Sequence, residues 1–559
     1  MAVSLHGLRY KIAAAAVLKF ATARAARLPA VRGGVLRLAG LLQTEGEPTG
    51  SYRGLAAGLL RTALDDATGS DTTGETLVYD PVAGLVPGAE PETAPDLGFL
   101  RARAEQDPSA GNLMTLAAAY RKSYVADFHA SAEAYEQAFA ANPKDLRGIE
   151  GILVSGARSH YDWPRIWRYV STLVPARGPV RAGSAFWAAI EPLYAQHPSP
   201  EEVAHAEKLV ADHEHQLSTL HQLLIETVAV RFQFLGSFRA GIRLRRIMAA
   251  NRVKELRGIP LESALWLKHL VGAYAYLEDE EKLRRTVQRP LLDTAHPAVR
   301  RQVDKLRADA ALWQGESAPL QSHAQQRDGE VASTLTDDTG ERTMREMVAG
   351  RRVAVVGPAA GKELYGGLID SYDVVVRTNL RRPLGRETAV RAGGRTDIAY
   401  YAGLDLVRHH GAVQDLVQSG SLALAVTRPH CLPAFQPVPP WLRIARFEFG
   451  LYYRGAPMGI QRILYDLLQY APAEIGLFHA DFYAGAQATV AGYREETMGF
   501  GPDSQANDPV VMHDLSFEFR LTQRLADAGL VSPHGTAAAV LSLNEQEYLA
   551  RLEVRNPLR

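Results

Sequence analysis

The sequence has few of the features that place a protein in a class at first sight. Cysteine occurs once among 559 residues, as Cys431. One cysteine excludes an intrachain disulfide and a cysteine-rich zinc site and fits a reducing compartment, so we expect a cytoplasmic protein. Lysine plus arginine and aspartate plus glutamate balance at 62 each. Because the whole chain has no basic excess, we expect no nucleic-acid partner.

The N-terminal segment, residues 1–42, has no long hydrophobic run. Its longest wholly apolar stretch is Ile12–Leu18, against the ~20 residues that a membrane-spanning helix needs. The segment carries basic residues from Arg9 to Arg37 and no acidic residue before Glu45. Three interpretations stay open: an ordinary basic helix, a disordered arm, or a segment lying on an anionic membrane surface. The third predicts peripheral contact with the inner face of the membrane.

Composition divides the rest of the chain into four parts. Residues 43–96 are rich in Thr, Gly, Pro and acidic residues, and this predicts a linker. Residues 97–313 read as one helix after another, which predicts an all-α region. Residues 314–345 are polar and poor in large apolar side chains, so we expect a second linker there. Residues 346–559 carry the signs of an α/β domain.

The all-α region contains a pattern typical of a helical repeat. In Ser131–Pro143, the residues Tyr135, Ala138 and Pro143 stand at the offsets of a tetratricopeptide (TPR) second helix, and Asn112–Tyr124 supplies its partner helix. No clean period follows. The pattern favours a degenerate TPR-like solenoid with a concave surface for a protein partner, and a plain helical bundle is the alternative.

The α/β domain opens at residues 351–379. Val353–Val356 is an apolar, β-branched run of the kind that forms a buried parallel strand, and Val374–Val376 is a second one. A glycine-containing turn and Tyr365–Ile369, a helical turn, separate them. This order is typical of a nucleotide-binding Rossmann-like fold, with the ligand beyond the strands' carboxyl ends. Neither the GxGxxG spacing of dinucleotide-binding proteins nor a P-loop is present.

Polar residues follow a later strand of this domain. Arg454–Tyr470 predicts a glycine-led amphipathic helix, and the strand after it is followed by His479, Asp481 and Tyr483. A helix N-terminus beside polar groups at a strand's carboxyl end favours phosphate binding. The further strands expected here are Ile398–Tyr401, Ala423–Thr427 and Ile475–Phe478.

Three stretches together resemble the sialyltransferases. VAVVGPAAGKELYGGLIDSYDVVVRTN, with Gly385, Glu387 and GRTD after it, resembles the family's large motif. APMGIQRILYDLLQYAPAEIGLFHADFY resembles the small motif, and its Asp-Phe-Tyr ending is similar to the bacterial form. HDLSFE resembles the His-x4-Glu motif. The three occur in the family's order over about a third of the chain, within residues 351–529.

The resemblance implies an inverting, metal-independent glycosyltransferase without a cofactor. Such an enzyme moves a sialic-acid-like sugar from a CMP-sugar to a glycan acceptor, and in a bacterium it would build surface polysaccharide. High alanine, glycine and arginine with little lysine are typical of a GC-rich bacterial genome. The resemblance assigns His513 as general base, with Tyr483 and His479 at the leaving phosphate. The substrate-binding residues it implies are Gly357, Asn379, Gly459, Asp481 and Glu518.

Structural roles remain open for the same residues. His513 also fits an ordinary helix-start histidine, and Glu518 fits a residue that orients its helix or pairs with a basic neighbour. His479 and Asp481 fit strand-end residues that bind loop amides, and Asn379 fits a turn cap.

The motifs also depart from the family pattern. Pro358 replaces an asparagine, Pro457-Met458 replaces a Ser/Thr pair, and Val353 replaces the large-motif cysteine. Two alternatives therefore stand beside the sialyltransferase hypothesis: a transferase for another CMP-linked keto-sugar acid, and a non-catalytic TPR-type scaffold with a degenerate transferase domain.

Overall fold

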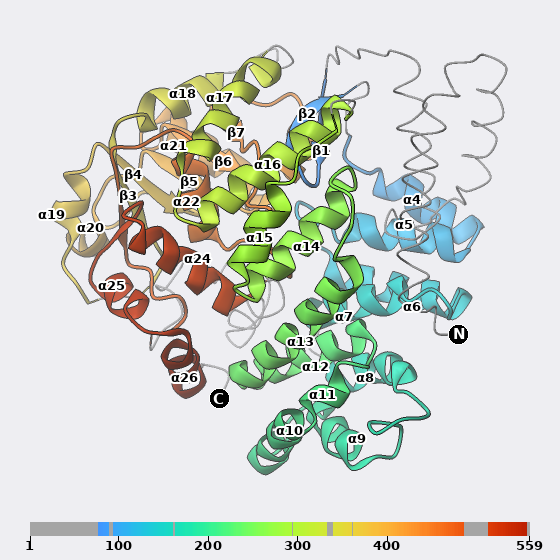
Figure 1. Cartoon of the computed structure of the whole chain (residues 1–559). Coiled ribbons are helices and arrows are strands. Elements are labelled where there is room, and N and C mark those ends of the chain that lie inside the picture. The colour runs from blue at the N-terminus through green and yellow to red at the C-terminus, as the bar shows by residue number, and fades with distance from the viewer. Residues whose placement is uncertain are drawn as a thin grey trace.

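The computed structural model describes residues 76–88, 93–159, 162–292, 295–332, 339–359, 362–485 and 513–555. The basic segment 1–42 lies outside them, so its interpretations stay predictions. Figure 1 shows a helical region, blue to green, against an α/β region, yellow to red.

One parallel sheet organises the C-terminal region. Among the described residues, seven strands pair in the order β7-β6-β5-β4-β3-β8-β9, and all neighbours run parallel. The predicted α/β, Rossmann-like architecture is therefore confirmed. The strands are β3 (Arg352–Val356), β4 (Val374–Thr378), β5 (Ile398–Tyr400), β6 (Leu424–Thr427), β7 (Leu442–Ile444), β8 (Glu474–Phe478) and β9 (Ser532–Pro533).

The central strands form where the sequence has apolar, β-branched runs. Val353 pairs with Val374 on one side and with Ile475 on the other, and all three side chains are buried. A parallel strand that is covered on both faces needs apolar side chains in both directions, which these runs supply. The helices of this region are α18 (Thr339–Val348), α19 (Gly366–Asp370), α20 (Arg386–Ala392), α21 (Gly403–Gln418), α22 (Gly459–Leu468), α24 (Leu515–Asp527), α25 (Thr536–Leu541) and α26 (Glu545–Arg555).

The region between residues 97 and 332 is helical throughout its described parts. Neighbouring helices pack in chain order: Ser131 Oγ donates to the Ala117 carbonyl and lies 2.9 Å from Ser155 Oγ, joining α5, α6 and α7. Bundles and solenoids share such packing, so the TPR-like repeat stays a prediction. The α-helices are α4 (Leu97–Gln106), α5 (Ala110–Tyr120), α6 (Phe128–Ala141), α7 (Arg147–Ser159), α8 (Trp163–Val170), α9 (Ala185–Ile190), α10 (Pro200–Asp212), α11 (Glu214–Leu217), α12 (Gln222–Phe234), α13 (Phe238–Leu256), α14 (Ala264–Tyr276), α15 (Glu280–Val287), α16 (Pro297–Trp313) and α17 (Ala318–Ala332).

Both segments expected as linkers contain regular structure. Within 43–96, β1 (Thr76–Asp80) and β2 (Gly84–Gly88) form an antiparallel hairpin. Leu85 is buried, and its N–H donates to the Arg446 carbonyl of the α/β region at 2.8 Å. Within 314–345 the structure has most of α17 and the start of α18. The linker interpretation fails there because tertiary burial, which composition does not report, holds these short elements in place.

The helical and α/β regions share one hydrophobic core. Trp313 of α16 stacks on Phe517 of α24, with ring centroids 4.9 Å apart. Lys305 and Asp309, fully buried on α16, form an ion pair; Asp309 also accepts hydrogen bonds from Gly450 N and the Tyr465 hydroxyl. The helical region thus packs tightly against the α/β region.

Candidate functional site

The sheet has a topological switch point between β3 and β8. From β3 the chain adds β4, β5, β6 and β7 on one side, and it returns to add β8 and β9 on the other. Ligands of open α/β sheets bind in the crevice outside the carboxyl ends of the strands at such a point. Here the two strand ends touch, because Gly357 N donates to the Phe478 carbonyl at 2.8 Å. A Cβ on Gly357 would lie 2.4 Å from the His479 carbonyl, so a side chain has no room there.

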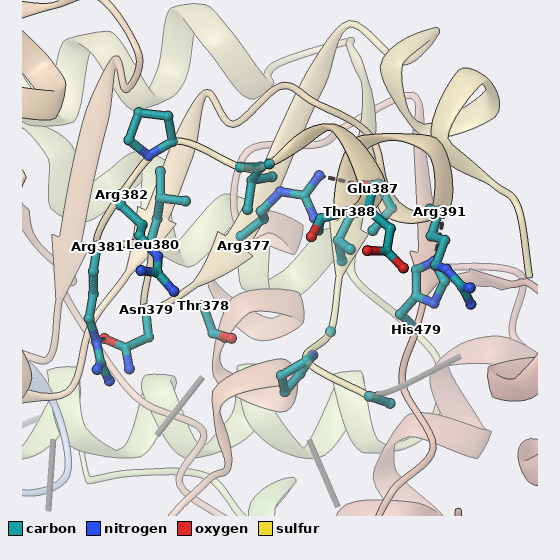
Figure 2. Close-up of a pocket in the computed structure, with 18 of the residues that line it drawn as sticks. Arg377, Thr378, Asn379, Leu380, Arg381, Arg382, Glu387, Thr388, Arg391 and His479 are labelled. Carbon is teal, nitrogen blue, oxygen red and sulfur yellow. Dashed lines mark hydrogen bonds between the residues drawn. The ribbon is translucent and has the colours of Figure 1, made fainter. Parts of the chain in front are cut away.

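Two adjoining cavities open at this edge of the sheet. The larger has a volume of about 770 Å³ and lies over the ends of β3 and β4 (Figure 2). The smaller, about 80 Å³, lies against the start of α22. They share four lining residues: Pro358, Ala359, Thr378 and His479.

Residues that the sequence placed in one site converge here. The larger cavity is lined by Gly357, Asn379 and His479, which follow three different strands. The smaller is lined by Gly459, His479, Asp481, Tyr483 and His513. Parallel strands all end at one edge of a sheet, so residues far apart in the chain meet there. Glu518, the remaining candidate, lines neither cavity.

The backbone is strained at this edge. Four residues that line the cavities have a positive φ without being glycine: Asn379 (55°), His479 (49°), Phe482 (51°) and Tyr483 (62°). Each such residue costs on the order of 1–3 kcal/mol and persists only where the surrounding structure holds it. Such strain gathers at functional sites, and here it turns the chain sharply after β4 and β8.

His513 is held by a backbone carbonyl. Its Nδ1 lies 2.5 Å from the Ala456 oxygen. A carbonyl oxygen can only accept, so Nδ1 carries the proton, and in the neutral ring Nε2 is the basic nitrogen. The His513 side chain is 17 % exposed and lines the smaller cavity. This tautomer is the one that a proton-accepting histidine needs.

Glu518 is buried close to His513 but does not line either cavity. Its carboxyl group is fully buried and accepts hydrogen bonds from the Tyr452 hydroxyl at 2.6 Å and from Met458 N at 2.9 Å. It lies 3.9 Å from His513 Nδ1. The expected substrate contact of Glu518 does not fit this position; the carboxylate instead fixes the turn before α22. Burial raises the pKa of Glu518 to about 8, outweighing these two hydrogen bonds.

This raised pKa predicts a pH-dependent stability. Between its ordinary value of 4.5 and about 8, Glu518 is protonated in the folded chain and ionised in the unfolded chain. The folded state then holds the extra proton, so stability falls as the pH rises through this window. Glutamine has no proton to lose, so its stability lacks this pH dependence. We expect the melting temperature of Glu518→Gln, relative to that of the wild type, to increase as the pH rises from 5 to 9. Exposed Glu105→Gln is the control; a Glu518→Gln difference that stays constant with pH would contradict the expectation.

His479 and Asp481 also make local contacts. His479 Nε2 donates to the Arg391 carbonyl at 3.1 Å, and burial lowers the pKa of its imidazole. Asp481 accepts from Tyr483 N at 3.0 Å, and burial raises the pKa of its carboxyl to about 6. Asp481 thus binds a loop amide, as the structural alternative expects, whereas His479 connects the end of β8 to α20 through a carbonyl. Both residues also line the smaller cavity.

The larger cavity has an arginine-rich lining that the motif comparison did not identify. Glu387 is the one acidic residue among the described residues that line it. Arg377 is buried without a carboxylate in contact; its guanidinium donates to Thr396 Oγ1 and to the carbonyls of residues 392, 393 and 395. Burial lowers the pKa of Arg377 to about 10, so it remains charged at neutral pH. The arginines of the lining are Arg377, Arg381, Arg382 and Arg391 (Figure 2).

The sequence alone could have indicated two of these four arginines. Arg381 and Arg382 stand within four residues of the end of β4, in the loop that begins at the carboxyl edge of the sheet. Nothing local, however, shows that Arg391 of α20 faces the same space. Four arginines against one glutamate make the larger cavity suited to an anionic ligand.

In the described residues, no group of three or more His, Cys, Asp or Glu side chains is placed to hold a metal ion. Within those same ranges, no helix has the length and apolar character needed to cross a membrane.

No family model matches this chain, and no curated protein matches it. Among solved structures, the chain is similar to a mammalian sialyltransferase in complex with Gal-β1-3GalNAc-ortho-nitrophenol. The identity is 15 %, over 39 % of this chain and 85 % of that one, with a TM-score of 0.20. A likeness at this TM-score carries no argument about activity.

Proposed function

We propose that this chain is an inverting glycosyltransferase that uses a CMP-activated, sialic-acid-like sugar, with His513 as general base. The observation that supports it is the convergence of the three motif stretches. Gly357, Asn379, Gly459, Tyr483 and His513 span 157 positions of the chain and line two adjoining cavities at the switch point.

The geometry is compatible with the chemistry. In an inverting transfer, a base takes the proton of the acceptor hydroxyl while that oxygen attacks the anomeric carbon and CMP departs. His513, with its proton on Nδ1, has Nε2 as the nitrogen to receive this proton. The phosphate of the departing CMP gains negative charge. Two groups beside the smaller cavity are suited to stabilise this charge. They are the first N–H groups of α22, at Gly459 and Ile460, and the side chain of Tyr483.

The charge of the larger cavity fits such a donor. A CMP-linked keto-sugar acid carries a phosphate and a carboxylate, and both are planar or tetrahedral anions that arginine recognises well. The excess of arginine over glutamate in the lining would favour this donor over a neutral sugar. This excess of arginine does not distinguish a sialic acid from another keto-sugar acid, because both carry the same two anionic groups.

The non-catalytic scaffold remains the second candidate. Pro358 and Met458 line the smaller cavity where the family has polar side chains, and Met458 N already donates to Glu518. The nucleotide would then have fewer hydrogen-bond donors than in the family. A scaffold would use the helical region for a protein partner, and neither that partner nor the peripheral membrane contact of residues 1–42 is needed for the transferase.

Thermal shift with cytidine nucleotides tests the proposal. CMP at 100 times its dissociation constant is expected to stabilise the folded chain by about 2.7 kcal/mol, whereas UMP and AMP leave the melting temperature unchanged. Release of CMP from CMP-N-acetylneuraminic acid and from CMP-linked octulosonic acid would then identify the donor class. If no cytidine nucleotide raises the melting temperature, the transferase is abandoned; binding without CMP release favours the scaffold.

A further inference from the structure

A buried network of charged groups connects the helical region to the candidate base. Its centre is Arg245 of α13, whose guanidinium lies 2.8 Å from Asp514 and 3.5 Å from Glu226 of α12. The side chains of these three residues are at most 4 % exposed. Burying such a group is costly unless it is paired, so the contacts of this network are strongly constrained.

One arm of the network fixes the start of α24. Asp514 directly follows His513 and is the N-cap of this helix, where its carboxylate accepts from Phe517 N at 3.0 Å. The same carboxylate accepts from Arg245 and, at 2.9 Å, from the hydroxyl of Tyr276 on α14. Two groups of the helical region therefore hold the residue next to the base.

The other arm fixes the carbonyl that His513 contacts. Glu226 also pairs with Arg454, at 3.0 Å, and Arg454 stands two residues before Ala456. The Ala456 oxygen accepts from His513 Nδ1. Glu226 thus connects both sides: through Arg245 to the helix that starts beside His513, and through Arg454 to the loop that orients its ring.

We propose that helices α12, α13 and α14 are a positioning element of the catalytic site, with Glu226, Arg245 and Tyr276 setting the place of His513. This inference rests on the proposed function, because it assigns the helical region to the same reaction. None of the three residues lines either cavity, so they act through His513 and its partner carbonyl. A general base must be held within a fraction of an ångström of its productive place, and small displacements cost rate more than binding.

A pair of tyrosine variants tests this role. Arg245→Met would leave the buried Asp514 carboxylate without its cation and endangers folding, so we choose Tyr276→Phe, which removes one hydroxyl. Its matched control is Tyr465→Phe. Tyr465 is equally buried, and its hydroxyl donates to Asp309 of α16 at 2.8 Å, also between the two regions but outside both cavities. Both variants are expected to lose a similar amount of melting temperature, about 2–4 °C.

Catalysis separates the two variants. The donor is whichever of CMP-N-acetylneuraminic acid and CMP-linked octulosonic acid releases CMP in the wild type. We expect Tyr276→Phe to lower kcat for this release about 10-fold, with KM and the affinity for CMP unchanged. Tyr465→Phe is expected to keep the kcat of the wild type. In an active wild type, an unchanged kcat in Tyr276→Phe overturns the inference.

A second readout does not depend on activity. In protein labelled with ring-¹³C histidine, the His513 signal is assigned by its loss in His513→Gln. We expect it to shift in Tyr276→Phe and not in Tyr465→Phe. If the wild type releases CMP from neither CMP-N-acetylneuraminic acid nor CMP-linked octulosonic acid, the proposed function fails by itself. A shifted signal then still supports positioning of His513, and an unmoved signal overturns it.

Discussion

His513→Gln is expected to reduce sugar transfer by at least about 100-fold, the lower range for loss of a general base. Glutamine keeps a side-chain N–H that can donate to the Ala456 carbonyl, the contact that His513 Nδ1 makes at 2.5 Å. It has no nitrogen that accepts a proton near neutral pH. The local structure therefore persists while the chemistry is lost. The measurement is CMP release with saturating donor, in which water takes the place of the acceptor hydroxyl, together with the thermal shift that CMP causes.

The pattern of loss matters as much as its size. The CMP-induced shift should be the same in His513→Gln as in the wild type, because a base acts on the acceptor hydroxyl. His129→Gln is the control, since His129 is exposed on α6 and pairs with Glu133 of the same helix. A His513→Gln protein that transfers sugar at more than about a tenth of the normal rate would remove His513 from the role of base.

Arg443→Met is expected to cause the largest loss of stability. The Arg443 guanidinium is 1 % exposed and binds both oxygens of Asp466, at 2.5 and 3.1 Å, as well as Glu341 at 2.8 Å. Removing the cation leaves the Asp466 carboxylate buried without its charge partner, at a cost of about 3–5 kcal/mol. We expect the melting temperature to fall by about 6–20 °C.

An exposed arginine of the same sheet provides the control. Arg352 pairs with Glu474 at 3.0 Å, but the two side chains are 46 % and 33 % exposed. Water screens such a pair, so Arg352→Met should cost less than about 1 kcal/mol. Equal melting temperatures for the two variants would show that the Arg443 cluster contributes nothing beyond a surface pair. The cluster also anchors α18 through Glu341, within a segment whose composition had indicated a linker.

The central strands could be predicted because their signal is local. Each of Val353–Val356, Val374–Val376 and Ile475–Phe478 is an apolar run of strand length, and parallel strands covered on both faces require that composition. The edge strands β7 and β9 could not be predicted from the sequence. β7 has three residues and β9 has two, one of them Pro533, so neither carries a recognisable pattern. They form because β6 and β8 offer free edges to pair with.

The residues of the candidate site also divide into those that the sequence could predict and those that it could not. The motif residues that follow strands, such as Asn379 and Tyr483, were recognisable in order and spacing, and strand ends of a parallel sheet must meet at one edge. Glu518 was recognisable too, but its burial beneath Met458 depends on Tyr452 and the loop before α22. Arg391 of the larger cavity carried no signal, because a helix surface in sequence does not reveal what faces it.

The sequence alone determined the parallel α/β core, the helical character of residues 97–313 and the candidates Gly357, Asn379, Gly459, Tyr483 and His513. These follow from period, composition and motif, which act over a few residues. Tertiary structure alone decided that hairpin β1–β2 and α17 are structured, that arginines gather in the larger cavity, and that Arg245 and Tyr276 reach Asp514. Each of these depends on burial between segments far apart in the chain, and burial is set by partners that a local pattern does not name.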